Sequence, residues 1–257
     1  MTKKPGFLFG GLAAISLMCP CLLNADAGRP LTSPSLSPAN MTAQWWQWAF
    51  SMPNVSTTEG DWIHPLVGDD STSGEPGFYE SCGNGQHGDL WFLGGDFAGT
   101  GEPFERTCTI PFGKTIVLAV INVECSTAEG DATAGDPVKQ QADDLKDCAE
   151  SIGNDLSGTA AFGPIGGDLQ EVRVERLSTV NAFPLWISPS NVAGLEDPIT
   201  PNPSLSQADG QWVILRNLQP GFYRLEFSGV YISPDVFELN GAYNLEIAKP
   251  NGDTAVE

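Results

Sequence analysis

The stretch from Cys82 to Cys125 decides the fold of this chain and reads CGNGQHGDLWFLGGDFAGTGEPFERTCTIPFGKTIVLAVINVEC. It contains two short apolar runs, Leu90–Leu93 and Thr115–Val123, which are rich in β-branched and aromatic residues. Glycines flank the first run, and the turn sequence Pro111–Lys114 leads into the second. Short apolar runs bounded by turn residues are typical of buried strands. We therefore expect two buried strands in this stretch.

Strand patterns dominate the chain after Ser157, apart from a proline-rich loop at Val192–Gln207. The expected strands are Gln170–Leu177, Phe183–Ile187, Trp212–Leu215, Gly221–Ser228, Val230–Ile232 and Ala242–Ile247. The first alternates polar and apolar residues, and the second carries Pro184, which favours an edge position. Many short strands joined by Gly and Pro turns predict a mainly β protein, a β-sandwich or jelly-roll-like single domain.

Two helices are expected beside the strands. The tryptophan-rich segment Met41–Met52 predicts an N-terminal helix capped by Asn40 or Thr42, and its apolar faces predict that it packs on a sheet. A second, inserted helix is expected to begin at Asp136-Pro137 and to run to about Ile152.

The N-terminal segment has the features of a secretory signal peptide. Lys3 and Lys4 precede an apolar stretch, and Ala25-Asp26-Ala27 supplies the small residues of a cleavage site. We expect residues 1–27 to be the signal peptide, residues 28–40 an extended arm and residues 41–257 the β-sandwich domain. The expected location is secreted or periplasmic. A membrane anchor or a lipidated Cys19 are the alternatives, which the short apolar core and the bulky residue before Cys19 disfavour.

Four cysteines remain after residue 27, and an even number in an exported chain predicts disulfides. Four cysteines allow three pairings, of which we favour Cys82–Cys108 with Cys125–Cys148. No CxxC spacing points to zinc.

The formal net charge is −20. A charge of this sign and size repels nucleic acid and anionic lipid, so neither is an expected partner. No transmembrane segment is expected after residue 27.

Four motifs spread over residues 41–247 read WWQWA, CGxGQxGxxWFLxG, RxCxxPxGKxIxxxxIN and GQWVxLxxLxPGxYxLxF. Together they resemble a family of exported bacterial proteins of unknown function. The resemblance implies a shared fold and implies no particular chemistry.

Signatures of catalysis are few. The only histidines are His64 and His87, both in loops, and we expect both to be exposed to solvent. Glycosidases use two carboxylates, and the acids Asp89, Glu105 and Glu124 near the central strands are the candidates for that role.

A calcium loop is the sharpest local pattern. Oxygen-bearing side chains at Asp69, Ser71, Ser73 and Glu80 follow calcium-loop spacing, with Gly74 at the sixth position. The other interpretation is a turn cluster, because serines replace acids and no helices flank it. We expect either no cofactor or Ca²⁺ at this loop.

The sequence favours a secreted, non-enzymatic protein that binds a ligand or packs into a surface assembly. Trp62 and Trp186 are the candidates for stacking on sugar, and a glycan or an envelope component is the expected partner. The alternative is a carbohydrate-active enzyme, a glycoside hydrolase or lyase, that uses the paired carboxylates.

Overall fold

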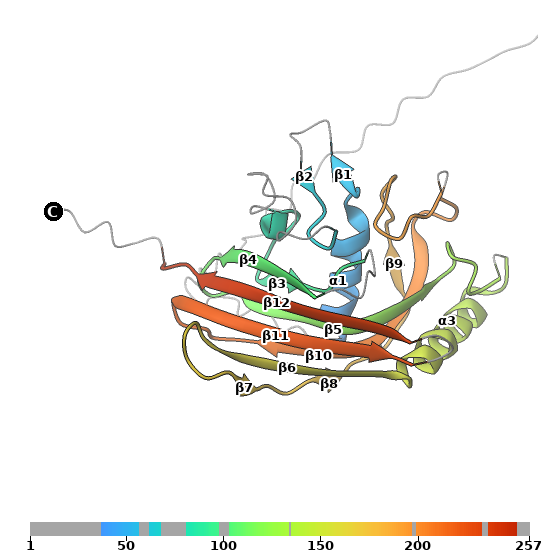
Figure 1. The fold of residues 1–257 in the computed structure, drawn as a ribbon. Coiled ribbons are helices and arrows are strands. Elements are labelled where there is room, and N and C mark those ends of the chain that lie inside the picture. Colours follow the sequence, from blue (N-terminus) through green and yellow to red (C-terminus); the bar gives the residue numbers. More distant parts are fainter. Residues whose placement is uncertain are drawn as a thin grey trace, which may run out of the picture. The chain divides into compact units, whose positions relative to one another are not determined.

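The structure, a computed structural model, describes residues 37–56, 62–67, 81–97, 103–133, 135–196, 199–232 and 236–250. These residues all belong to the unit Leu36–Glu257. Two five-stranded sheets dominate it (Figure 1). The expected signal peptide and most of the expected arm lie outside the described residues.

The first sheet, called here the inner sheet, is built on the two apolar runs. Its strand order is β3-β5-β10-β8, and β9 also pairs with β10. The strands are β3 (Leu90–Leu93), β5 (Thr115–Ser126), β8 (Glu175–Arg176), β9 (Phe183–Leu185) and β10 (Ser204–Leu215). β3 is parallel to β5, and the other pairs are antiparallel. Both buried strands predicted in the stretch Cys82–Cys125 are therefore present, side by side.

The second sheet, called here the outer sheet, has the order β4-β12-β11-β6-β7. Its strands are β4 (Phe104–Ile110), β6 (Leu156–Pro164), β7 (Gln170–Glu171), β11 (Gly221–Tyr231) and β12 (Phe237–Ile247). Only the β4–β12 pair is parallel. A separate two-stranded ribbon pairs β1 (Val55–Ser56) with β2 (Trp62–Ile63).

The two sheets pack face to face over an apolar core. Residues from both sheets form this core, including Leu118 and Val120 of the inner sheet and Leu225 and Tyr243 of the outer sheet. The fold is thus the mainly β sandwich that the sequence predicts. Two glycines of the outer sheet allow it to lie close to the inner sheet, because a Cβ at Gly158 or Gly229 would lie within 2.6 Å of β5 side chains. Any larger residue at these positions would push the sheets apart.

Helix α1 (Pro38–Ser51) covers the other face of the inner sheet. Trp45, Trp48 and Trp212 are almost fully buried there, which confirms that the predicted tryptophan helix packs on a sheet. The predicted cap was wrong, because Ser37 is the N-cap and its side chain accepts a hydrogen bond from the Asn40 backbone N–H. Pro38 fits the first helical turn, where its missing N–H is not needed, so the helix begins three residues earlier than expected.

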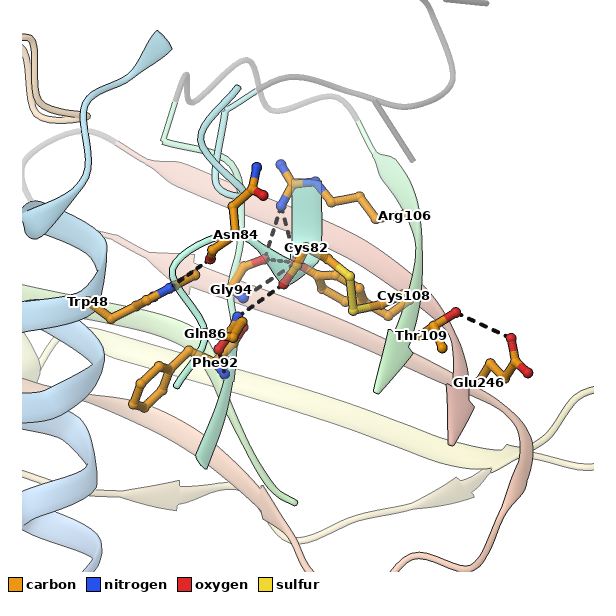
Figure 2. The surroundings of a disulfide bond; sticks show 11 residues. Trp48, Cys82, Asn84, Gln86, Phe92, Gly94, Arg106, Cys108, Thr109 and Glu246 are labelled. Atoms are coloured by element: carbon orange, nitrogen blue, oxygen red, sulfur yellow. Dashed lines mark hydrogen bonds between the residues drawn. A yellow bond between two sulfur atoms is a disulfide. The ribbon is translucent and has the colours of Figure 1, made fainter. Parts of the chain in front are cut away.

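Both predicted disulfides are present, Cys82–Cys108 and Cys125–Cys148. The first ties the short helix η1 (Ser81–Gly83) to β4, as Figure 2 shows. The turn after it is held by Gln86, whose amide donates to the Cys82 and Phe92 carbonyls at 3.1 and 2.7 Å. Gly85 has a φ of 67°, and a Cβ there would lie 2.3 Å from the sulfur of Met52. The turn therefore requires glycine at this position.

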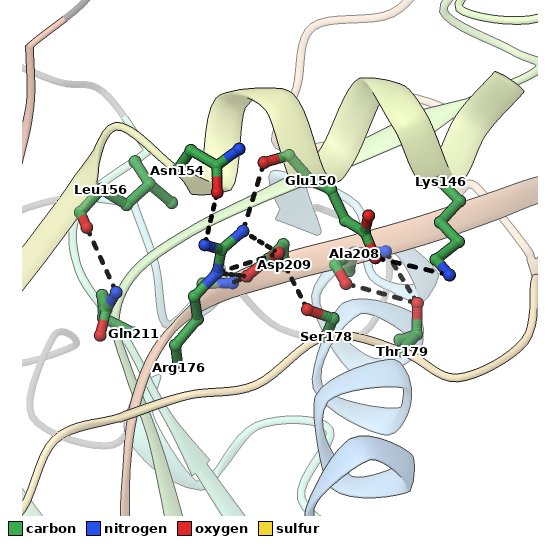
Figure 3. A network of polar contacts seen from close by, with 11 residues as sticks. Lys146, Glu150, Asn154, Leu156, Arg176, Ser178, Thr179, Ala208, Asp209 and Gln211 are labelled. Atoms are coloured by element: carbon green, nitrogen blue, oxygen red, sulfur yellow. Dashed lines mark hydrogen bonds and ion pairs between the residues drawn. The ribbon is translucent and has the colours of Figure 1, made fainter.

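Helix α3 (Val138–Gly153) is fixed to the inner sheet by the second disulfide and by the half-exposed Arg176, which pairs with a buried carboxylate. The Arg176 guanidinium donates to the fully buried Asp209 carboxylate at 2.7 Å, and also to the Asn154 side chain and the Glu150 carbonyl (Figure 3). A Cβ on Gly153 would lie 2.5 Å from the Asp209 carboxyl carbon. Glycine at the helix end thus makes room for the ion pair.

Several strand predictions need correction. The segments Gly221–Ser228 and Val230–Ile232 are joined in one continuous strand, β11, which ends at Tyr231, and the strand predicted to begin at Ala242 begins at Phe237, as β12. The segment Gln170–Leu177 is not one strand, because β7 pairs with β6 of the outer sheet and β8 with β10 of the inner sheet. The segment therefore crosses from one sheet to the other. Strand β10 begins at Ser204, inside the predicted proline-rich loop, eight residues before the predicted start at Trp212.

Within the described part of the chain, we find no helix that combines the length and the apolar character needed to cross a membrane.

Candidate functional site

The outward face of the outer sheet is hollowed into a groove of about 760 Å³. The strand alternation turns Leu225 and Phe227 of β11 into the core, and it turns Arg224 and Glu226 outward. Small side chains at Ala161, Ala242 and Ser228 form part of the lining. These small side chains leave space between the larger side chains that line the groove.

Glutamates and alanines alternate across the sheet in one row of this groove. The register places side by side, from one edge strand to the other, Glu171, Ala161, Glu226, Ala242 and Glu105. Neighbouring strands lie about 4.8 Å apart, so successive glutamate Cα atoms are about 10 Å apart. The row thus forms two troughs, each with an alanine between two carboxylates.

Arg224 joins two of these carboxylates. Its Nε donates to Glu226 Oε1 at 2.6 Å, and its Nη2 donates to Glu105 Oε2 at 3.2 Å. Asn244 completes the network, since its amide donates to Glu105 Oε1 at 2.6 Å and its oxygen accepts from Arg224 at 3.0 Å. The hydrogen bond to Glu226, followed by that to Glu105, raises the pKa of the Arg224 guanidinium. These polar groups are therefore held in fixed positions while they remain partly open to water.

The groove has a net negative charge among its described lining residues, because the glutamates Glu105, Glu171 and Glu226 outnumber the one cation, Arg224. Planar carboxylates, an amide and a guanidinium offer many donors and acceptors to a ligand rich in hydroxyl groups. An anionic ligand would be repelled.

The three acids predicted as a catalytic set do not come together. Glu105 lies in the groove, and Asp89 is exposed just before β3 of the inner sheet. Glu124 lies on β5 beside Ala208, which faces the α1 core, so the inner sheet separates it from the groove. Proximity in the sequence therefore does not produce a shared site for these residues.

Glu124 has unusual surroundings. One carboxylate oxygen accepts a hydrogen bond from Ser206, and the other is buried and has no hydrogen-bond partner among the described residues. Burial first, and then the neighbouring Glu129, raises the pKa of Glu124 well above its ordinary value. The side chain therefore favours its protonated form more than an exposed glutamate does.

The two predicted stacking tryptophans are not in the groove. Trp186 is 61% exposed and follows strand β9, on the inner sheet. The Trp62 side chain lies outside the described residues. An exposed aromatic does occur near the groove, since Phe222 is 62% exposed and lies two residues before Arg224 on the same face of β11.

The predicted calcium loop, Asp69, Ser71, Ser73 and Glu80, lies outside the described residues and stays a prediction. Elsewhere in the described chain, one trio of metal-ligand side chains comes close together, Cys125, Asp131 and Cys148. Its two sulfurs form a disulfide and are not available to a metal.

One of the two histidine predictions was wrong. His87 is exposed as expected, whereas His64 is completely buried. Its Nε2 lies 2.9 Å from the Ala49 carbonyl oxygen, and its Nδ1 accepts a hydrogen bond from the Leu66 N–H. Backbone groups satisfy both ring nitrogens, so His64 has a structural position under α1.

Sequence reasoning missed Arg224, Glu226 and Asn244 as site residues. The alternation in GFYRLEFS and AYNLEI was visible, and it places these three residues on the face opposite Leu225 and Leu245. A signal was therefore present, but nothing in the sequence showed that β4, β11 and β12 are neighbours.

Searches against protein-family models, curated proteins and solved structures found no match to this chain. The resemblance noted for the four sequence motifs therefore stays a prediction.

Proposed function

We propose that this chain is an exported, non-enzymatic binding protein whose ligand lies in the groove of the outer sheet. The observation that carries the proposal is the network of Glu105, Arg224 and Glu226 in a groove of about 760 Å³, which Asn244 braces from beside the groove. Export is supported by the two disulfides, which persist in oxidising compartments, and by the N-terminal sequence.

The chemistry of the groove favours a saccharide that is uncharged or carries amino groups. Fixed carboxylate, amide and guanidinium groups match the donors and acceptors of sugar hydroxyl groups. The network is ordered before any ligand binds, because Arg224 already holds both carboxylates, which lowers the entropy cost of binding. The excess of glutamates disfavours acidic polysaccharides.

Binding is a better fit to the network than glycoside hydrolysis. A hydrolase needs one protonated and one ionised carboxyl group on either side of the scissile bond. Glu105 and Glu226 are instead both bonded to the same guanidinium. The carbohydrate-active enzyme remains the alternative function, and release of reducing sugar ends from the same saccharides would identify it.

A binding screen with three classes of soluble oligosaccharide tests the proposal. Cello-oligosaccharides are the neutral probe, chitosan oligomers the basic probe and oligogalacturonates the acidic probe. We expect saturable binding of a neutral or basic probe and none of the acidic one. Arg224→Gln should weaken binding at least about tenfold, which corresponds to about 1.4 kcal/mol. The absence of saturable binding by both the neutral and the basic probe would contradict the proposal.

Glu246→Gln is the matched control. Glu246 lies on the same face of β12 as Ala242, and its carboxylate accepts a hydrogen bond from the Thr109 hydroxyl at 3.2 Å (Figure 2). It does not line the groove. We expect this variant to bind as the wild type does. Equal weakening by Glu246→Gln and Arg224→Gln would show that the loss of binding is not specific to the groove.

A further inference from the structure

The groove of the outer sheet is elongated across the strands. Its lining includes residues of all five strands of this sheet, from Glu171 on β7 to Glu105 on β4 (Figure 1). Five strands enclose four spacings of about 4.8 Å, so the groove is about 19 Å long in this direction. Along the strands the lining is shorter, about 7 Å from Thr159 to Ala161 and from Asn240 to Ala242, and about 14 Å from Arg224 to Ser228. An extended ligand that fills the groove therefore lies across the strands.

The row of glutamates and alanines in this groove repeats every two strands. Glutamates stand on β7, β11 and β4, and alanines stand between them on β6 and β12. The second trough thus repeats the first, two strand spacings further along the groove. A ligand that matches this row advances by one unit per strand spacing, about 4.8 Å, and presents the same group at every second unit.

Sugar chains with β-1,4 linkages have both of these periods. Their linkage bonds are equatorial, so the chain is extended and each pyranose advances it by about one strand spacing. Successive sugars are turned over relative to each other, so every second sugar presents the same edge. A chain with α-1,4 linkages curves instead, because one bond at each linkage is axial. Such a chain cannot follow a row of five residues across a sheet.

We propose that the groove binds an extended β-1,4-linked oligosaccharide whose chain lies across the strands of the outer sheet. Each trough spans two strand spacings and takes two sugars, so the groove holds about four sugars in all. One pair of sugars lies at the carboxylates that Arg224 joins, Glu226 and Glu105, and the other pair reaches Glu171. This inference rests on the proposed function, since it specifies the linkage, length and direction of the saccharide in the same groove.

Calorimetric titration with cello-oligosaccharides and chitosan oligomers of different lengths tests the expected length. In the series that binds, we expect the affinity to rise at least about tenfold between two and four sugars, because the second trough is then filled. Between four and six sugars it should rise by about threefold or less, because the added sugars extend beyond the groove and a chain of six offers only three stretches of four.

The variant Glu171→Gln tests the direction of the chain. A chain of four sugars across the strands reaches β7, so this variant should weaken its binding about fivefold. A chain of two sugars can occupy the trough that Arg224 spans, so its affinity should change by less than about twofold. A chain that lay along β11 would not reach Glu171, and the variant would leave its binding unchanged. Glu246→Gln is again the matched control and should bind both lengths as the wild type does.

Linkage is tested with maltotetraose, which has the same four glucose units as cellotetraose in α-1,4 linkage and should bind at least about tenfold more weakly. Three results would overturn this inference and leave the proposed function standing: full affinity with two sugars, undiminished binding of four sugars by Glu171→Gln, or equal binding of cellotetraose and maltotetraose. No saturable binding in either β-1,4-linked series would overturn both. The length series uses the wild-type protein, so it decides even where a variant does not fold.

Discussion

The buried ring of His64 makes the stability of this protein depend on pH. The neutral ring with its proton on Nε2 satisfies both neighbours, because it donates to the Ala49 carbonyl and accepts from the Leu66 N–H. Burial is the main reason that the pKa of His64 is lowered to about 4, and the charge of Arg106 adds to this decrease. The hydrogen bond to the Ala49 carbonyl opposes the decrease. Protonation would remove the acceptor that Leu66 uses and would leave a charge in the core.

The sign of the effect follows from proton binding in the two states. The ordinary pKa of His64 is 6.5, so between pH 6.5 and about 4 the unfolded chain binds a proton that the folded chain does not. The free energy of unfolding therefore falls as the pH is lowered through this window. Linkage gives a loss of about 2 kcal/mol by pH 5 and about 3 kcal/mol by pH 4. Above pH 7 this group contributes no pH dependence.

Urea denaturation at pH 7, 5 and 4 measures this loss. Comparison with His64→Gln isolates it, because other titrating groups are common to both proteins. We expect the wild type to lose about 3 kcal/mol more than the variant between pH 7 and pH 4. His87→Gln is the matched control for an exposed histidine, and it should follow the wild type. Parallel curves for the wild type and His64→Gln would refute the reasoning. Where His64→Gln does not fold, NMR of the wild type decides, since protonation of the His64 ring above pH 5 would refute it equally.

Three further outcomes follow from buried groups. Arg176→Met should lower the free energy of unfolding by about 3–5 kcal/mol because it leaves the buried Asp209 carboxylate without a cation, with hydrogen bonds from Ser178 and Gly210 alone among the described residues. Asp209→Asn should cost less because Arg176 can turn to solvent. Urea denaturation ranks the two variants, and the reverse order would contradict this account. Because the pKa of Glu124 is raised in the folded state, its contribution to stability is lost as the pH rises above the ordinary value of 4.5, so Glu124→Gln should become more stabilising, relative to the wild type, as thermal melts are repeated at increasing pH. Replacement of Cys125 and Cys148 by serine should lower the free energy of unfolding by about 2–4 kcal/mol, and an unchanged urea midpoint would contradict this.

The core elements of the fold were predictable because their apolar residues are continuous in sequence. The runs in β3 and β5 needed no knowledge of their partners to be identified as buried strands. The tryptophans of α1 likewise required a sheet to pack on. The favoured disulfide pairing was also confirmed.

Strand β10 shows where local pattern fails. Its N-terminal half carries Ser206, Gln207 and Asp209, which are all buried. These polar groups are stable there only because partners such as Glu124 and Arg176 come from other elements. The sequence contains no local sign of those partners, so the segment resembled a loop.

His64 was missed for a related reason. Its hydrogen-bond partners are backbone groups, which every residue carries, so no side-chain pattern marks the position as buried.

The candidate site was only partly predictable, because the sheet joins residues that are distant in sequence. Glu105 was singled out, but it was grouped with Asp89 and Glu124, its neighbours along the chain. The sheet instead places it beside Arg224, 119 positions away. The parallel pairing of β4 with β12 creates this contact, and strand order cannot be read from alternation alone.

A steric block of the groove tests the account most directly. Ala161 lies in the trough between Glu171 and Glu226, and Ala161→Trp would fill that trough while it removes none of the polar groups. Calorimetric titration with the tightest neutral or basic oligosaccharide from the screen should show saturable binding to the wild type. The account predicts that Ala161→Trp loses this binding while its melting temperature stays close to that of the wild type. Undiminished binding by a folded Ala161→Trp protein would contradict the claim that the outer sheet's groove is the ligand site.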